Sequence, residues 1–262
     1  MKSGDYMIIH VLASGSKGNM VLLSSTSGWI AIDCGISKNK MLKKLETLNI
    51  NIRDIKHLMI THEHSDHTAG LKSMMQLNHL NSIYLTKGTY DVLKETIDEG
   101  HATFHQIMPE VLFSIDQYNI TGFLASHDAK EPIGIVVSSG SHKVVVGTDT
   151  GYIDEVYEPI LKDADVYLIE ANHEPQKLLA SPRPMHLKKR ILGEKGHLNN
   201  DDAAMFINRM MKHKKTHWIV MHISEDCNSE RDIEKSIVKY IEKPLQLEVY
   251  YANQHEIVSL EL

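Results

Sequence analysis

The chain has 262 residues, of which 42% are hydrophobic and 24% are charged. This balance is typical of a globular protein and argues against global disorder. The net charge of −6, with histidine neutral, argues against a protein whose main task is to grip long duplex nucleic acid. The 17 histidines are the unusual count, and only their spacing can show whether they bind metal.

Three features bear on the cellular setting. The longest stretch without Asp, Glu, Lys or Arg covers residues 18–32, which is too short and too polar to cross a membrane. No basic segment leads into an apolar core at the N-terminus, so no secretory signal is expected. Two cysteines, Cys34 and Cys227, are too few for a disulfide scaffold. We expect a cytoplasmic protein without a membrane partner; if phage-encoded, it would act in the host cytoplasm.

The predicted elements alternate between strands and helices along the chain. Apolar and β-branched runs predict strands at residues 8–12, 20–24, 29–32, 58–60, 83–85, 120–125, 133–137, 143–146, 166–169, 218–221 and 247–251. Helical spacing of apolar residues predicts helices at residues 40–48, 68–77, 89–97, 154–161 and 201–211. This mixture predicts a layered α/β protein with sheets inside and helices outside. No linker or composition shift divides the chain, so we expect one domain over residues 1–262.

The strongest functional signal is the sequence THEHSDH at residues 61–67, directly after an apolar run. On a tight turn after a strand, His62 and His64 can converge on one cation, while Asp66 and His67 face a second. Imidazole and carboxylate ligands without thiolate suit zinc, manganese or iron. A polar surface loop with chance histidines is the alternative, which the density and order of the pattern disfavour.

One short loop cannot close a two-metal site, so further ligands must come from elsewhere in the chain. Three apolar runs are each followed by a ligand-type side chain, namely His127, Asp149 and His222. Loops at strand ends carry function on a rigid scaffold. Each of the three alone is more often an ordinary polar residue, but beside the first motif we expect them to complete the site.

These residues resemble the metallo-β-lactamase superfamily. The resemblance implies a four-layer αββα sandwich, in which two sheets pack face to face and helices cover the outside. It implies that Asp33 orients the metal loop and that Asp149 bridges two divalent ions, zinc or manganese. The other six ligands would be divided between the ions, with His62, His64 and His127 on one and Asp66, His67 and His222 on the other. Because true lactamases have cysteine at the position of Asp149, β-lactam hydrolysis is not expected.

Shorter motifs resemble the YycJ/WalJ branch of this superfamily, which is similar to ribonuclease Z. They are VLASGSKGN at 11–19, SHDA at 126–129, TDTGY at 148–152, EANH at 170–173 and GHL at 196–198. The activity of that branch is 5′-directed DNA exonuclease. Related phage anti-Pycsar enzymes hydrolyse cyclic nucleotides. The last thirty or so residues are divergent, and nothing is carried over onto them.

The substrate side of the site rests on Glu170, which ends an apolar run, and His197, which precedes the expected helix at 201–211. A helix N-terminus favours anions. In ribonuclease Z relatives a histidine in a similar place acts on the phosphate or leaving group and a glutamate holds it, so we expect Glu170, His197 and Asp66 to be catalytic. A solvated basic face is the usual explanation of the stretch 181–195, but its position beside His197 suggests phosphate contacts. The candidates are Arg183, Lys188 and Arg190.

Two cations about 3.5–4 Å apart that share one water would lower the pKa of that water towards roughly 7. We therefore expect a metal-dependent phosphodiesterase, namely a DNA or RNA exonuclease of the YycJ/WalJ type. A cyclic-nucleotide phosphodiesterase of the anti-Pycsar type is the main alternative, because the chain is acidic and has no inserted clamp domain. A glyoxalase II-type thioester hydrolase leaves Glu170 and His197 unexplained, and a flavo-diiron-like redox partner would need a flavin module. Relatives often pair, so we expect a homodimer.

Overall fold

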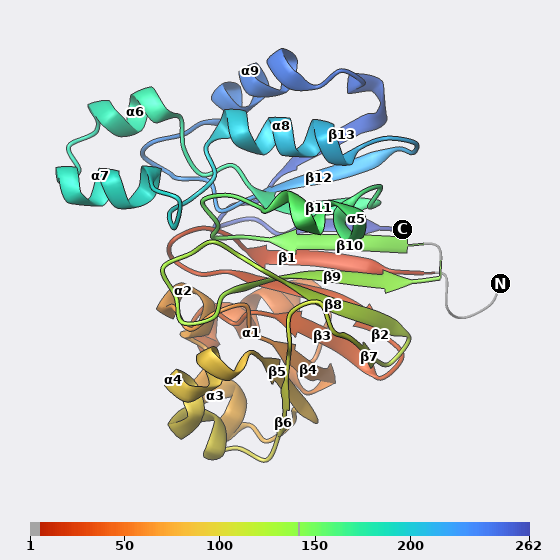
Figure 1. Ribbon diagram of the computed structural model, residues 1–262. Helices are drawn as coiled ribbons and strands as arrows, with labels where there is room; N and C mark the ends of the chain where they lie inside the picture. The colour runs from red at the N-terminus through yellow and green to blue at the C-terminus, as the bar shows by residue number, and fades with distance from the viewer. Residues whose placement is uncertain (1–5, 141) are drawn as a thin grey trace.

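The computed structural model describes residues 6–140 and 142–262. Within these ranges the strands form two seven-stranded sheets (Figure 1). The first runs in the order β14-β1-β2-β3-β4-β5-β6 and the second in the order β13-β12-β11-β10-β9-β8-β7. The strands of the first sheet are β1 (Ile8–Ala13), β2 (Met20–Ser25), β3 (Gly28–Ile32), β4 (Ile55–Met59), β5 (Ser82–Leu85), β6 (Thr103–Gln106) and β14 (Val258–Glu261). Those of the second are β7 (Leu112–Ile115), β8 (Tyr118–Leu124), β9 (Ile133–Ser139), β10 (His142–Gly147), β11 (Val166–Glu170), β12 (Thr216–Met221) and β13 (Leu247–Tyr251).

Helices lie outside both sheets (Figure 1). In the part of the chain that contributes most of the first sheet they are α1 (Lys38–Thr47), α2 (Ser65–Thr68), α3 (Leu71–Gln76) and α4 (Lys87–Asp98). Those that follow are α5 (Glu158–Leu161), α6 (Pro175–Ala180), α7 (Met185–Leu192), α8 (Asn200–Met210) and α9 (Glu230–Tyr240). Short 3₁₀ turns cover Ile52–Asp54, Glu155–Tyr157 and Pro244–Gln246. None of the helices in the described ranges is long and apolar enough to span a bilayer.

Alternation along the strands divides the apolar residues into three layers, because successive side chains in a strand point to opposite faces. Leu168 of β11 packs in the layer between the sheets together with Val11 of β1. Its neighbour Tyr167 faces the other way, into the layer shared with Ile207 of α8. On the outer face of the first sheet, Met41 of α1 belongs to the third layer. The arrangement is the predicted four-layer αββα sandwich.

Strand direction brings the predicted ligand loops to one edge of each sheet. Strands β3 and β4 are parallel, so the residues after both, including Asp33 and His62, lie at the same end. Strands β10, β11 and β12 are also parallel, which places Asp149, Glu170 and His222 together at their carboxyl ends. Strand β8 is separated from β10 by two antiparallel steps, so the loop with His127 joins them.

The predicted continuous helix over residues 68–77 is wrong, because the chain forms two short helices, α2 and α3, that meet at Gly70. The Gly70 amide donates to the carbonyl of Cys34 at 2.7 Å. A Cβ on Gly70 would lie 2.6 Å from the carbonyl oxygen of Ile36 and 2.7 Å from that of Cys34. The close approach of these backbones interrupts the helix and anchors the metal loop to the β3–α1 connection.

Candidate metal centre

The segment that runs from the end of β4 into α2 is held by backbone contacts from two other connections. The amide of Asn19 donates to the carbonyl of Asp66 at 2.7 Å, and that of Cys34 donates to the carbonyl of His67 at 2.8 Å. A Cβ on Gly35 would lie 1.6 Å from the Asp66 carbonyl oxygen, so only glycine fits there. These backbone contacts and this glycine therefore determine the path of the loop, and a bound cation is not needed to hold it.

Asp33 connects the loop to its imidazoles. Its Oδ1 accepts from the Thr61 amide at 2.9 Å, and its Oδ2 lies 2.7 Å from Nδ1 of the fully buried His67. With a proton on Nδ1, His67 directs the lone pair of Nε2 away from Asp33. This is the geometry of a residue that orients the histidines of the metal loop, which is the role that the resemblance implies for Asp33.

Three residues of the site have left-handed backbone conformations that side chains other than glycine rarely adopt. Their φ values are 59° for Asp33, 55° for Asp149 and 49° for His222. Asp33 and His222 directly follow a strand, and Asp149 stands two residues after the end of β10. Such conformations are costly and cluster at functional sites, where the surrounding structure enforces them. They point to a site that orders these side chains at some expense in stability.

The first ligand cluster consists of His62, His64 and His127. Nδ1 of His64 lies 3.1 Å from Nε2 of His62 and 3.2 Å from Nε2 of His127. Nδ1 of His127 lies 3.1 Å from the Gly196 carbonyl, to which it donates when protonated, and this leaves the Nε2 lone pair facing the cluster. Burial lowers the pKa values of His62 and His127, which favours the neutral imidazoles that metal binding requires.

The second cluster consists of Asp66, His67, Asp149 and His222. Nε2 of His222 lies 3.4 Å from Oδ2 of Asp66 and 3.2 Å from Oδ1 of Asp149. Nε2 of His67 lies 2.5 Å from Oδ2 of Asp149. Burial opposes protonation of His67, but Asp33 and Asp149 outweigh it and raise its pKa well above the ordinary value. Surroundings that favour a proton there also favour a cation.

The surroundings of the buried Asp149 carboxylate show whether these residues fit a metal. Neither of its carboxylate oxygens has a hydrogen-bond donor of acceptable alignment. Yet nitrogens of His67, His197 and His222 lie within 3.3 Å of them. Carboxylates and imidazoles that converge without forming aligned hydrogen bonds are the donor set of a divalent cation. The side chains therefore fit the metal that the sequence predicted.

Glu170 and His197 form a pair beside this cluster. Oε1 of Glu170 accepts from the amides of Thr150 at 2.7 Å and Leu198 at 3.3 Å, while Oε2 lies 3.0 Å from Nδ1 of His197. Burial lowers the pKa of His197, but Glu170 and Asp149 outweigh it and raise the pKa to about 9. Glu170, His197, Asp149 and His222 are also close enough to hold a cation. Because three N–H groups already face Glu170, we treat it as the partner of His197.

A pocket of about 410 Å³ opens beside the second cluster. His197 and His222 line it, as do two of the predicted phosphate contacts, Arg183 and Arg190. The third, Lys188, does not line it: the residue is buried and its ammonium donates to the Leu179 carbonyl at 2.6 Å. Because α7 turns Lys188 towards α6, the structure does not bring it to the cleft.

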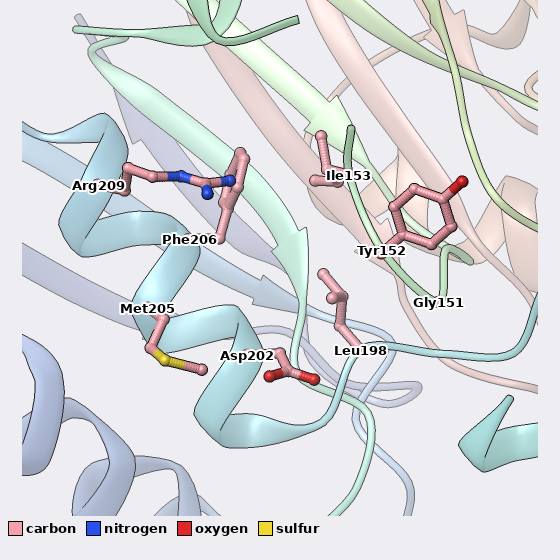
Figure 2. A pocket seen from close by; sticks show the side chains of 8 residues that line it. All are labelled: Gly151, Tyr152, Ile153, Leu198, Asp202, Met205, Phe206 and Arg209. Carbon is pink, nitrogen blue, oxygen red and sulfur yellow. The ribbon is translucent and has the colours of Figure 1, made fainter. Parts of the chain in front are cut away.

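A second pocket, of about 400 Å³, lies between the segment at Tyr152 and helix α8 (Figure 2). None of its eight lining residues belongs to a ligand cluster. Its guanidinium, on Arg209, already pairs with Glu155 and Glu158. The pocket at His197, which residues of the site line, is therefore the better candidate for the substrate.

The model of the β-lactamase superfamily domain matches residues 28–223. The chain belongs to the β-lactamase superfamily. Exodeoxyribonuclease YycJ of Bacillus anthracis is 29% identical over 239 residues, which cover 89% of this chain and 88% of the relative. Exodeoxyribonuclease WalJ of Streptococcus pneumoniae is 30% identical over 223 residues, which cover 83% of this chain and 82% of the relative. This confirms the predicted YycJ/WalJ branch.

Solved structures confirm the fold. The metallo-β-lactamase fold protein YhfI of Bacillus subtilis superposes with a TM-score of 0.75 at 17% identity, covering 98% of this chain and 100% of YhfI. The short form of human tRNase Z gives 0.67 at 17% identity, covering 96% of this chain and 98% of that one. Family membership and the clustered histidines and aspartates identify this superfamily member as a metal-dependent hydrolase.

Sequence reasoning missed the contacts by which two residues, Thr61 and Asn172, support the metal ligands. Thr61 places its hydroxyl 2.9 Å from Oδ2 of Asp33 and 3.1 Å from Nδ1 of His62. The Asn172 amide donates to the His222 carbonyl at 2.8 Å and fixes the residue after β12. Both lie inside motifs that the sequence already shows, THEHSDH and EANH, but their orientation depends on contacts between distant strands.

We expect Asp33→Asn to weaken metal binding by about 10–100-fold, the usual effect of losing the residue that orients a ligating histidine. The asparagine side chain has only one acceptor oxygen. The Asp33 carboxylate has two, one for the Thr61 backbone amide and one for Nδ1 of His67. Competition with a chelating dye measures the metal affinity. An affinity equal to that of the wild type would show that Asp33 supports only the fold.

Proposed function

We propose that the protein is a phosphodiesterase that cleaves nucleotide phosphodiester bonds and acts as an exonuclease on nucleic acid. It would work with two divalent ions, zinc or manganese. The observation that carries the proposal is that two ligand clusters meet at one edge of the sandwich, beside the Glu170–His197 pair and a pocket lined by Arg183 and Arg190. The two exodeoxyribonuclease relatives support it.

Each side chain has a distinct role in this proposal. The ions would be held by His62, His64 and His127 on one side and by Asp66, His67 and His222 on the other, with Asp149 between them. Bound ions of this kind acidify a water to a pKa of about 7 and neutralise charge on the phosphoryl oxygens. Asp66, which is partly exposed, accepts or steers the proton of the attacking water. His197, held by Glu170, donates a proton to the leaving oxygen.

The size and lining of the pocket at His197 are consistent with a substrate group the size of a nucleotide. Its two arginines supply forked donors that match phosphate oxygens. Because the pocket is small and the chain is acidic, a cyclic-nucleotide phosphodiesterase of the anti-Pycsar type is the second candidate. The expected homodimer stays a prediction.

The substrate is tested by a panel of labelled single-stranded DNA, duplex DNA, RNA and cyclic mononucleotides. We expect manganese- or zinc-loaded protein to degrade the polymers from their ends, in line with the exodeoxyribonuclease relatives. End-blocked and circular DNA are the matched controls and should resist. Activity confined to cyclic mononucleotides would replace the exonuclease with the second candidate.

A generic substrate tests the chemistry without any choice of base. We expect the loaded protein to hydrolyse bis(p-nitrophenyl) phosphate, and a chelator to remove this activity until manganese or zinc is restored. Release of p-nitrophenolate provides the measurement. Failure to turn over with any divalent metal would reject the phosphodiesterase proposal.

A further inference from the structure

A forked ion pair joins helix α7 to the first ligand cluster. Nε and Nη2 of Arg190 both donate to the carboxylate of Asp128, the second of them at 2.9 Å. Asp128 directly follows the candidate ligand His127, and its Oδ1 lies 3.4 Å from Nε2 of that residue and 4.0 Å from Nε2 of His64. The carboxylate therefore lies between the histidine cluster and a guanidinium that lines the substrate pocket.

The fork determines which edge of the guanidinium remains available. Arginine carries five N–H donors in one plane, one on Nε and two on each terminal nitrogen. Asp128 takes one from Nε and one from Nη2. Of the other three, one on Nη1 and one on Nη2 form the terminal edge, and among the described residues none forms a hydrogen bond or ion pair with Nη1. Half of the Arg190 side chain is exposed, so this edge is accessible from the pocket.

We propose that Asp128 is a positioning residue that fixes the side edge of Arg190, so that the terminal edge binds a non-bridging oxygen of the substrate phosphate. This inference rests on the proposed function, because it takes phosphate as the group bound in the pocket. Asp128 acts through Arg190 and supplies neither a metal ligand nor a proton.

The ion pair with Asp128 matters for Arg190 because few other contacts hold helix α7 in place. Helices α6 and α7 project from the sandwich (Figure 1), and the apolar cluster beneath them is small, with Leu178, Ile191 and Cys227 as its buried members. A free arginine loses considerable rotamer entropy when it binds, and prior fixation removes that cost. Arg183, the other arginine of the pocket, is held less firmly, with single 3.4 Å contacts from Nη2 to Ser224 and Asp226.

The test compares Asp128→Asn, Arg190→Gln, Arg190→Lys and the double variant Asp128→Asn/Arg190→Gln as metal-loaded proteins. Inorganic phosphate is the probe. Its affinity is measured by calorimetry and, independently, as competitive inhibition of bis(p-nitrophenyl) phosphate hydrolysis. Elemental analysis gives the metal content of each variant. Glu155→Gln is the matched control, because it removes a carboxylate partner of a different exposed arginine, Arg209.

We expect Arg190→Gln to weaken phosphate binding about tenfold or more, as for the loss of a charge-assisted hydrogen bond. Asp128→Asn should weaken it about fivefold, and the double variant should match Arg190→Gln, because Asp128 acts only through Arg190. Arg190→Lys, which keeps the charge without the fork, should also lose affinity. Metal content and the Glu155→Gln control should stay at wild-type levels.

Phosphate affinity of Asp128→Asn within twofold of wild type would overturn the proposal. So would additive effects in the double variant, or a loss of metal from Asp128→Asn, which would make Asp128 part of the metal site. If Asp128→Asn does not fold, wild-type phosphate affinity in Arg190→Lys overturns the proposal, and a loss supports it. Absence of phosphodiester turnover in the wild type would reject the proposed function, whereas phosphate calorimetry still decides the role of Asp128.

Discussion

Asp149→Ala should lower kcat by about 10³-fold or more while leaving the protein folded. Asp149 belongs to the second ligand cluster and is the proposed bridge to the first, so its loss should disturb both proposed ions at once. Metal ions contribute several kcal/mol of charge stabilisation in such reactions, and about 4 kcal/mol corresponds to a factor of about 10³. Turnover of bis(p-nitrophenyl) phosphate measures the loss, and circular dichroism with thermal unfolding shows the fold.

The fold should survive because Asp149 contributes little to it. The side chain is buried and its oxygens lack aligned hydrogen-bond donors, so its removal does not break a hydrogen-bond network. His64→Ala should cause a similar loss through the first cluster alone. Asp201→Asn is the matched control. The Asp201 carboxylate stands at the start of α8, pairs with Lys239 of α9 and lies outside the ligand groups. Wild-type rates in Asp149→Ala or His64→Ala would reject the proposed site.

His197→Ala should lower kcat by about 10²–10³-fold on DNA, the usual contribution of a general acid. The size of the loss should depend on the leaving group. A nitrophenolate leaves without protonation, whereas the alkoxide of a nucleic acid needs a proton, so bis(p-nitrophenyl) phosphate should lose much less activity than DNA. Comparison of kcat on the two substrates makes the measurement. Equal losses on both would assign His197 to binding rather than to proton transfer.

Glu170→Gln should follow the same pattern with a smaller loss, of about tenfold on DNA. The amide oxygen of glutamine can still accept from the Thr150 and Leu198 amides, so the strand end keeps its structure. The charge that holds the proton on His197 is lost. A Glu170→Gln loss that is equal on both substrates would show that the pair does not act as an acid.

Local sequence patterns predicted much of the fold and most of the candidate site. The ligand-type residues follow apolar strands, and the parallel pairing of β10, β11 and β12 brings Asp149, Glu170 and His222 to one edge. Elements that the patterns missed have weak apolar signals. Strand β6 is largely exposed, and helix α6 has only six residues. Helix α9 was missed although its first turn is capped by Ser229.

Side-chain orientation on a helix could not be predicted. Lys188 and Arg190 stand two residues apart in one basic stretch, yet helix α7 turns the first towards α6 and the second towards the pocket. The partner of Arg190 is Asp128, which lies 62 residues away in the sequence. Contacts of this kind depend on how α7 packs on the sandwich, which no short motif encodes.

The metal content of the purified protein tests the central claim most directly. The protein is loaded with zinc or manganese, dialysed to remove free metal and analysed for metal ions per chain. We expect about two ions in the wild type, because the two ligand clusters would each hold one, and fewer in Asp149→Ala, which removes the proposed bridge between them. A wild-type protein that retains no ion would contradict the claim that these histidines and aspartates form a metal centre.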